Sequence, residues 1–341
     1  MTLAAVTGQP RAIEALRAAL ASGTLHHAYL FAGPAGVGKE AAAIGLAQAL
    51  ACEKQPGVGC GECGPCRRIE RRNHPDVTWV MPEAEQVARG LAGRSDFDHT
   101  PSREIKVDQI RALQERLAYR ALEAPRKVAI VVEAQALGTS AQNAFLKTLE
   151  EPPSGTVLVL LASAPDRLLP TMRSRCARIQ FGPLSRAQLA QRLEAEHSLD
   201  AGAAQLAASL AGGSLARALE LDAEQLGRRR EVIEQFEALP RDDARPWFKF
   251  AEEFGDSREA AEECLRVLAT WVRDVAVAGA GGASPVNADL VELARGAAAK
   301  VPAAALHRRQ SLVDQALVAV SERNGSPRLQ LERMLIELMA R

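Results

Sequence analysis

The chain has 341 residues, of which 47% are hydrophobic and only 4% aromatic, a composition that favours a helix-rich protein of two or three domains. Its 42 basic residues equal its 42 acidic ones, and this zero net charge argues against an independent protein whose main task is to bind DNA or RNA. The N-terminus shows no signal-peptide pattern, and no segment is apolar for long enough to span a membrane, so the expected location is the cytoplasm.

Strands and helices alternate in the first half of the chain. Helices are predicted over 9–22, 40–51, 107–122 and 140–150, and strands over 27–32, 77–81, 127–132 and 156–162. Several of these strands are continuously apolar, which is typical of a parallel sheet covered by helices on both faces. Residues 83–103 are polar and lack periodicity, so a mobile surface insertion is expected there. After residue 185 only helices are predicted, over 185–195, 200–210, 214–221, 223–239 and 329–339.

A phosphate-binding loop follows the first strand. The sequence from Gly33 to Lys39 has the form G-x-x-x-x-G-K, and Gly33, Gly36, Gly38 and Lys39 are the candidate residues that cradle a polyphosphate. The next position normally carries Ser or Thr, whose hydroxyl ligates Mg²⁺, but here it is Glu40. The sequence therefore predicts a loop that has kept its shape and lost a metal ligand. It leaves open whether ATP or ADP still binds.

A second magnesium ligand is missing further along the chain. Phosphate-loop ATPases place an aspartate at the end of a second buried strand, followed by a glutamate that orients the attacking water. Here Val132 stands in place of the aspartate and Glu133 follows it. Glu133 alone is a candidate general base, although a structural residue at a strand end is the simpler interpretation. Because Glu40 and Val132 affect the same ion, the sequence predicts weak or absent ATP hydrolysis and a degenerate Mg²⁺ site.

Four cysteines lie within fifteen residues, in the spacing C-x7-C-x2-C-x2-C. In a reducing compartment such a cluster indicates a metal site rather than disulfides. Four thiolates can close a tetrahedron around Zn²⁺ and leave no open position, which predicts a structural role. An iron–sulfur cluster and four unconnected free thiols are the alternatives. The candidate ligands are Cys52, Cys60, Cys63 and Cys66.

Several segments resemble the delta-prime family of subunits from bacterial DNA polymerase III clamp loaders, which are AAA+ proteins. The matching segments are 27–31, the four-cysteine module, 74–76 (His-Pro-Asp), 105–111, 143–153 (ending Leu-Lys-Thr-Leu-Glu-Glu-Pro-Pro) and 174–176 (Ser-Arg-Cys). The resemblance covers residues 5–221. Beyond them it rests on the helical pattern and on the ending Asn324…Leu329-x-Leu331-Glu332.

The resemblance implies an α/β, AAA+ phosphate-loop domain over 1–165 with a zinc module at 52–66. It also implies a small helical lid over 166–221 and an all-α oligomerisation domain, or collar, over 222–341. In this family the related gamma/tau subunits hydrolyse ATP. The resemblance therefore implies a fixed, non-hydrolysing subunit of a hetero-oligomer with a pentameric core. Its expected partners are the gamma/tau and delta subunits and, through the complex, the sliding clamp and primer–template DNA.

The resemblance also assigns a role to Arg175, the arginine of Ser-Arg-Cys. It implies that Arg175 acts in trans, as an arginine finger on the ATP of a neighbouring subunit, whereas a surface salt bridge is the alternative. Active relatives carry a nucleotide-sensing arginine at the position of Ala216. In this chain the nearby arginine is Arg217, one step round the helix.

Two other functions are weighed against this one. An active gamma/tau-like ATPase would need Ser or Thr at position 40, an aspartate at 132 and an arginine at 216, and the sequence has none of these. An independent zinc-dependent module that binds nucleic acid would need a basic surround. The arginines after the cysteines partly supply it, although solvated side chains on a helix face are the simpler interpretation. They are Arg67, Arg68, Arg71 and Arg72.

Overall fold

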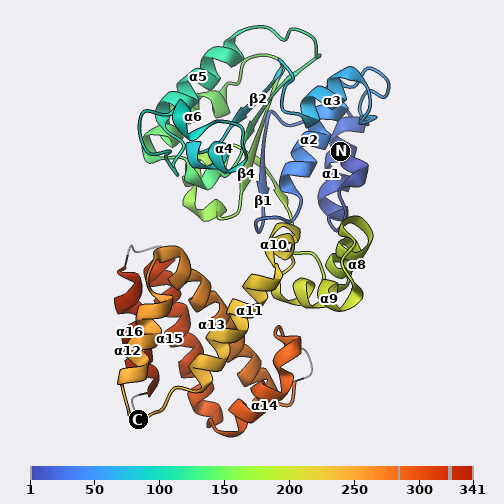
Figure 1. The fold of residues 1–341 in the computed structure, drawn as a ribbon. Coiled ribbons are helices and arrows are strands. Elements are labelled where there is room, and N and C mark those ends of the chain that lie inside the picture. The colour runs from blue at the N-terminus through green and yellow to red at the C-terminus, as the bar shows by residue number, and fades with distance from the viewer. Residues whose placement is uncertain (1, 283–284, 322–324, 340–341) are drawn as a thin grey trace. The chain divides into compact units, whose positions relative to one another are not determined.

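The computed structural model describes residues 2–282, 285–321 and 325–339 (Figure 1). The chain forms two compact units, one made of residues 1–188 with 213–216 and the other of residues 189–212 with 217–341. Asn324, which belongs to the family-like ending noted above, lies outside the described residues. In the part of the chain that is described, no helix is both long enough and apolar enough to cross a bilayer.

The first unit is built on a five-stranded parallel sheet. In space the strands follow the order β2-β3-β4-β1-β5. Neighbouring strands pair in register, for example Tyr29 with Val159 on one side and with Ala177 on the other. The strands are β1 (Ala28–Ala32), β2 (Val77–Val80), β3 (Lys127–Val131), β4 (Thr156–Ala162) and β5 (Ala177–Gln180).

Helices cover both faces of this sheet, as Figure 1 shows. Alternate residues of β1 belong to different cores, because side chains point to opposite faces along a strand. Phe31 packs in the core that includes α1 (Pro10–Ala21) and α2 (Lys39–Ala51). Leu30 packs in the core that includes α5 (Val107–Ala118) and α6 (Thr139–Glu150). The predicted α/β fold with a parallel sheet is confirmed.

Two parts of the first unit differ from the sequence-based prediction. The last strand that the sequence predicts is 156–162, but β5 follows it and pairs with the other side of β1. Its four residues alternate between half-buried and exposed positions and form no apolar run, so the hydrophobic pattern did not indicate an edge strand. Its amino end follows the short helix α7 (Pro170–Arg173).

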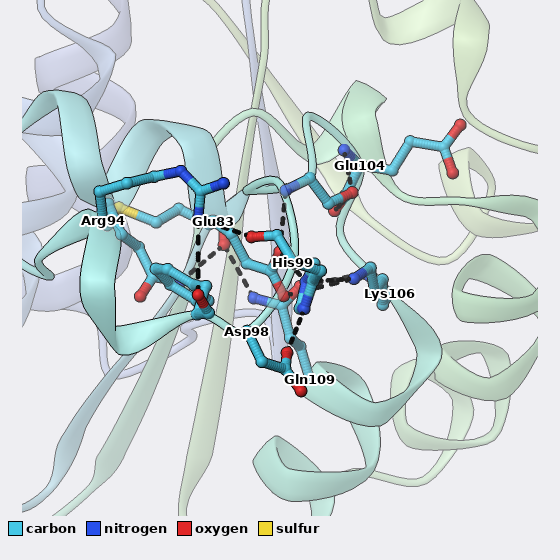
Figure 2. Close-up of polar contacts among 11 residues, drawn as sticks. Glu83, Arg94, Asp98, His99, Glu104, Lys106 and Gln109 are labelled. Carbon is cyan, nitrogen blue, oxygen red and sulfur yellow. Dashed lines mark hydrogen bonds and ion pairs between the residues drawn. The ribbon is translucent and has the colours of Figure 1, made fainter.

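The predicted insertion 83–103 is also more ordered than expected. It contains the helix α4 (Glu83–Ala88) and the 3₁₀ turn η2 (Arg94–Asp96). Figure 2 shows that Glu83, which is 9% exposed, and His99 tie this segment together. His99 lies 2.9 Å from Glu83 and 2.7 Å from Asp98, and the ammonium of Lys106 lies 2.9 Å from the His99 ring. Polar side-chain contacts therefore close a segment that has almost no apolar periodicity.

The second unit is helical, and its described residues contain no strand. The long helix α13 (Arg258–Gly279) lies at its centre and packs against most of the other helices. Trp271 of α13 is fully buried, and its indole N–H donates to Glu237 at 2.8 Å. The remaining helices are α9 (Ala201–Leu210), α11 (Ala223–Glu237), α12 (Arg245–Phe254), α14 (Val291–Ala299), α15 (Ala303–Ser321) and α16 (Pro327–Met339). Helix α8 (Arg186–His197) and helix α10 (Leu215–Glu220) each begin in the first unit and end in the second.

Candidate functional site

The phosphate loop connects β1 to α2, which is the context that such a loop requires. Gly33 has a φ of 154°, and a Cβ placed there would lie 2.0 Å from the carbonyl oxygen of Phe181. The ammonium of Lys39 donates to the carbonyl oxygens of Gly33, at 2.5 Å, and of Pro34. Burial lowers the pKa of Lys39 to about 8, although the charge of Glu133 opposes this shift. The loop thus lies between a strand and a helix as predicted, and its own carbonyl oxygens hold the lysine.

The loop packs closely against the start of α10. The backbone N–H of Leu215 donates to the carbonyl oxygen of Gly36 at 3.1 Å. A Cβ at Gly36 would lie 2.2 Å from the hydroxyl of Ser214 and 2.9 Å from the methyl group of Ala216, so only glycine fits there. Position 216 therefore lies against the phosphate loop. In this chain it carries only a methyl group.

Glu40 occupies the position of the missing magnesium ligand, and two arginines hold its carboxylate. Arg89 Nη1 donates to both carboxylate oxygens, at 2.8 and 2.9 Å, and Arg72 forms a second ion pair with it. About a quarter of each of these three side chains is exposed. Burial alone would raise the pKa of Glu40, but the hydrogen bonds from Arg72 and Arg89 outweigh it and the pKa falls below its ordinary value. The carboxylate is thus ionised, and its charge is neutralised by arginine.

These two arginines come from segments that the sequence did not connect to the loop. Arg72 follows α3 (Gly64–Glu70), and its guanidinium also lies 5.2 Å from the ring centre of Trp79. Arg89 follows α4 and makes a further ion pair with Glu85 at 2.6 Å. Arg72 is therefore a partly buried structural residue, which corrects the interpretation of all four arginines as solvated. Arg68 pairs with Glu123, and Arg67 and Arg71 are exposed.

Val132 is buried in the core at the end of β3, and its N–H donates to the carbonyl oxygen of Val80 at 2.8 Å. Glu133 follows in the left-handed region, with a φ of 51°, which is uncommon for a residue with a side chain. Burial and the nearby Glu85 raise the pKa of Glu133. The strand end thus presents an apolar side chain where a magnesium-binding carboxylate would be needed.

The structure brings the four predicted cysteines together. Their sulfur atoms all lie within 4.8 Å of one another, and those of Cys52 and Cys63 are 3.8 Å apart. Zn–S bonds of about 2.3 Å in a tetrahedron place sulfur atoms at about this separation. Cys52 caps the C-terminus of α2, whereas Cys63 is the N-cap of α3 and Cys66 lies in its first turn. The cluster has the geometry of a site that could hold a metal ion.

Backbone N–H groups also point at these sulfur atoms. Cys52 Sγ accepts from the N–H groups of Gln55 and Cys60, at 3.2 and 3.3 Å, and Cys60 Sγ accepts from that of Cys63 at 3.3 Å. Burial disfavours the thiolate at Cys52, Cys63 and Cys66. Backbone N–H groups outweigh burial at Cys52 and Cys63 and lower the pKa of each, whereas burial prevails at Cys66 and raises its pKa. Such hydrogen bonds favour the thiolate, which is the form that binds metal.

Arg175 lies at the opposite end of the sheet from the phosphate loop. It is two residues before β5, which runs parallel to β1, so it lies at the amino end of these strands. The loop follows the carboxyl end of β1. Arg175 forms an ion pair with Glu150 and donates to the carbonyl oxygen of Thr171 at 2.7 Å. The structure thus places a partly exposed guanidinium far from the lysine of its own chain.

Sequence reasoning missed two groups that support these sites. Gln9 is 4% exposed, and its amide donates to the carbonyl oxygens of Val37 and Gly182, at 3.2 and 2.7 Å, which supports the phosphate loop from the side. Asp76, in the family-like segment 74–76, accepts three backbone N–H groups at 2.7–2.8 Å and so fixes the turn before β3. The signal in the sequence was a polar residue next to a loop. It could not identify these contacts, because the groups that Gln9 and Asp76 bind are distant from them in the sequence.

The family model and the relatives described here all concern subunits of DNA polymerase III. The family described as "DNA polymerase III, delta subunit" matches residues 8–185. The DNA polymerase III subunit delta' of Bacillus subtilis is 36% identical over 233 residues, 68% of this chain and 65% of the relative, so the chain spans just under two thirds of that protein. The subunit delta' of Escherichia coli is 31% identical over 280 residues, 81% of this chain and 78% of the relative. The subunit tau of Escherichia coli is 35% identical over 226 residues, 64% of this chain and 32% of the relative.

Proposed function

The chain belongs to the family of DNA polymerase III delta-prime subunits, and from this premise we propose that it is a subunit of a clamp-loader complex that does not itself hydrolyse ATP. In this proposal the complex loads a ring-shaped sliding clamp onto primed DNA in an ATP-dependent manner. The chain would assemble with gamma/tau and delta subunits in a pentameric core in the cytoplasm. We retain the three predicted domains, over 1–165, 166–221 and 222–341, as part of the proposal.

The observation that carries the proposal is the ion-pair network at Glu40. In an active site of this class the hydroxyl at that position ligates Mg²⁺. Here a carboxylate stands there, already neutralised by Arg72 and Arg89. The second ligand position, Val132, is buried in the apolar core. A nucleotide entering the loop would also have to replace the two bonds that Lys39 makes to backbone carbonyl oxygens. These features support a loop retained for structure.

The topology of the sheet supports a role for Arg175 in trans. The five residues of β1 separate the amino end of the sheet, near Arg175, from the phosphate loop by about 17 Å. An arginine side chain is much shorter than this distance, so Arg175 cannot reach a nucleotide in its own loop. Its charge and planar fork suit the γ-phosphate of another subunit, where negative charge is redistributed during hydrolysis.

The four-cysteine cluster supports a structural Zn²⁺. All four donors are thiol sulfurs, their separations fit tetrahedral coordination, and the N–H···S contacts favour thiolates. Bound there, the ion would join the end of α2 to the start of α3. Since Arg72 follows α3, the cluster would also help to place the guanidinium that holds Glu40.

Equilibrium binding and turnover of ATP by the purified chain, alone and then with its partner subunits, test the proposal. The chain alone is expected to show no turnover, and the assembled complex is expected to hydrolyse ATP and to load clamps only when the chain is present. Turnover by the chain alone near 1 s⁻¹, abolished by Lys39→Ala, would instead identify it as an active gamma/tau-like ATPase. Independent binding of nucleic acid through the arginines near the cysteines would favour the other alternative, a zinc-dependent module that binds nucleic acid.

A further inference from the structure

The partner of Arg175 is fixed to the same end of the sheet. Glu150 is the last residue of α6, which stops before Pro152 and Pro153. The His27 ring, just before β1, lies 2.9 Å from the carbonyl oxygen of Leu149, so the end of α6 is held against the start of β1. The backbone that carries the Glu150 carboxylate is therefore fixed relative to the sheet.

Two groups hold the guanidinium of Arg175, and most of its N–H donors remain available. Its backbone N–H donates to Met172 at 3.2 Å, Nη1 donates to the carbonyl oxygen of Thr171 at 2.7 Å, and Nη2 pairs with Glu150. A guanidinium carries five N–H donors. Within the described residues Arg175 uses two of them, so the remaining donors can still bind another anion while the side chain keeps this orientation.

Local electrostatics give no reason for an acid at position 150. The C-terminal end of a helix carries partial negative charge, which disfavours a carboxylate in the last turn. Glu151 follows directly and adds a second negative charge. The ion pair is also half-exposed, with 34% of the Arg175 and 47% of the Glu150 side chain accessible, and pairs of this kind contribute little to folding. Neither the helix nor the stability of the fold accounts for Glu150, whereas its contact with Arg175 does.

We propose that Glu150 is a positioning residue for Arg175. It holds the guanidinium in one orientation at the amino end of the sheet, ready for the triphosphate of a neighbouring subunit. A long arginine side chain loses much rotamer freedom when it is fixed. If Glu150 fixes it beforehand, less of that entropy is lost at the transition state, so the rate of hydrolysis rises while the affinity for ATP does not change. This inference rests on the proposed function of Arg175 in trans.

Single-turnover hydrolysis of ATP by the assembled complex tests it. The phase that depends on Arg175 is identified as the one removed by Arg175→Ala. Glu150→Ala is expected to slow this phase by about two- to fivefold, the effect of an exposed ion pair, with the ATP concentration at half-saturation unchanged. Glu150→Gln keeps an oxygen that accepts from Nη2 and is expected to recover part of the rate. Glu151→Ala, which removes the same charge one residue later, is the matched control and is expected to behave as wild type.

A double-mutant cycle separates positioning from other effects. If Glu150 acts through Arg175, then Glu150→Ala has no further effect in the Arg175→Ala background, whereas independent losses that add would overturn the inference. A wild-type rate for Glu150→Ala beside a slowed Arg175→Ala would also overturn it and leave the proposed function intact. A normal rate of hydrolysis by the Arg175→Ala complex would contradict the proposed function of Arg175 in trans. If Glu150→Ala does not assemble, Glu150→Asp replaces it, because the withdrawn carboxylate keeps the charge but no longer reaches Nη2.

Discussion

Glu40 and Arg89 are joined by two hydrogen bonds from one guanidinium nitrogen, 2.8 and 2.9 Å long, although they are 49 residues apart in the sequence. The contact links the first turn of α2, directly after the phosphate loop, to the segment that follows α4. With Arg72 on the other side, Glu40 connects three parts of the first unit. Where an ATPase of this class has a hydroxyl that ligates Mg²⁺, this chain thus has an ion-pair bridge within the protein.

The first prediction concerns the stability that this bridge provides. Glu40→Thr restores a hydroxyl but leaves Arg72 and Arg89 without their common partner, so we expect the free energy of unfolding to fall by about 1–3 kcal/mol. The variant is not expected to hydrolyse ATP, because Val132 still supplies no magnesium ligand. Urea unfolding and an ATPase assay measure the two effects. Glu14→Thr, at an exposed position of α1, is the control. Equal stability of Glu40→Thr and wild type would show that the network is not structural.

The sequence predicted the elements whose signals are local. The strand–loop–helix at residues 28–51 and the cysteine spacing are contained in short segments, and both appear in the structure as expected. The contact between Glu40 and Arg89 could not be predicted in this way, because it depends on how α4 folds back within a polar segment. Strand β5 could not be predicted for a related reason. It lies at the edge of the sheet, where it is defined by its pairing with β1 and not by an apolar run. Long-range polar contacts and edge strands need the tertiary structure.

The second prediction is that the four-cysteine cluster binds one zinc ion per chain. Cys63→Ser removes a ligand and is expected to lower both the zinc content and the melting temperature, since metal binding and folding are coupled. Metal analysis by mass spectrometry and thermal unfolding measure these changes. Cys176→Ser alters a cysteine outside the cluster and is expected to retain full zinc content. Iron in place of zinc would indicate the alternative cluster, and a metal-free chain of undiminished stability would contradict a metal site.

The third prediction concerns Asp76, whose carboxylate accepts the N–H groups of Leu122, Glu123 and Ala124. Burial would raise its pKa, but these three hydrogen bonds lower it below the ordinary value of 3.8. A carboxyl group with a lowered pKa stabilises the fold above its unfolded pKa, and this stabilisation is lost as the pH falls through the folded pKa. We therefore expect Asp76→Asn to lose about 1–3 kcal/mol at neutral pH.

The pH dependence distinguishes this effect from a change of shape. The difference in stability between wild type and Asp76→Asn is expected to shrink as the pH falls below 3.8, because wild-type Asp76 becomes neutral too. Chemical unfolding at a series of pH values measures it. Asp108→Asn is the control, since that carboxylate is exposed and pairs only with Arg111 among the described residues. A difference that stays constant down to low pH would refute the role given to the charge of Asp76.

The last prediction tests the proposed action of Arg175 in trans. Arg175→Ala is expected to leave the chain folded and able to assemble, because its ion pair with Glu150 is half-exposed and contributes little to stability. If Arg175 acts in trans as proposed, the variant is expected to slow hydrolysis at one nucleotide of a neighbouring subunit, where a finger can be worth about 10³-fold or more. Since the other sites of the complex keep their own arginines, steady-state turnover falls by much less than this.

Arg173→Ala is the matched control for that measurement. Arg173 is two residues earlier, is exposed to the same degree as Arg175 and pairs with Asp166 at 2.5 Å, so its replacement removes the same charge from the same edge of the sheet. We expect it to leave hydrolysis and clamp loading unchanged. Single-turnover hydrolysis resolves the affected site, and size-exclusion chromatography verifies assembly of each variant. An arginine finger must act on the nucleotide through its own guanidinium and not through the charge of the surface around it. If Arg175→Ala acts only by preventing assembly, or if both variants slow hydrolysis equally, then Arg175 is therefore an interface residue.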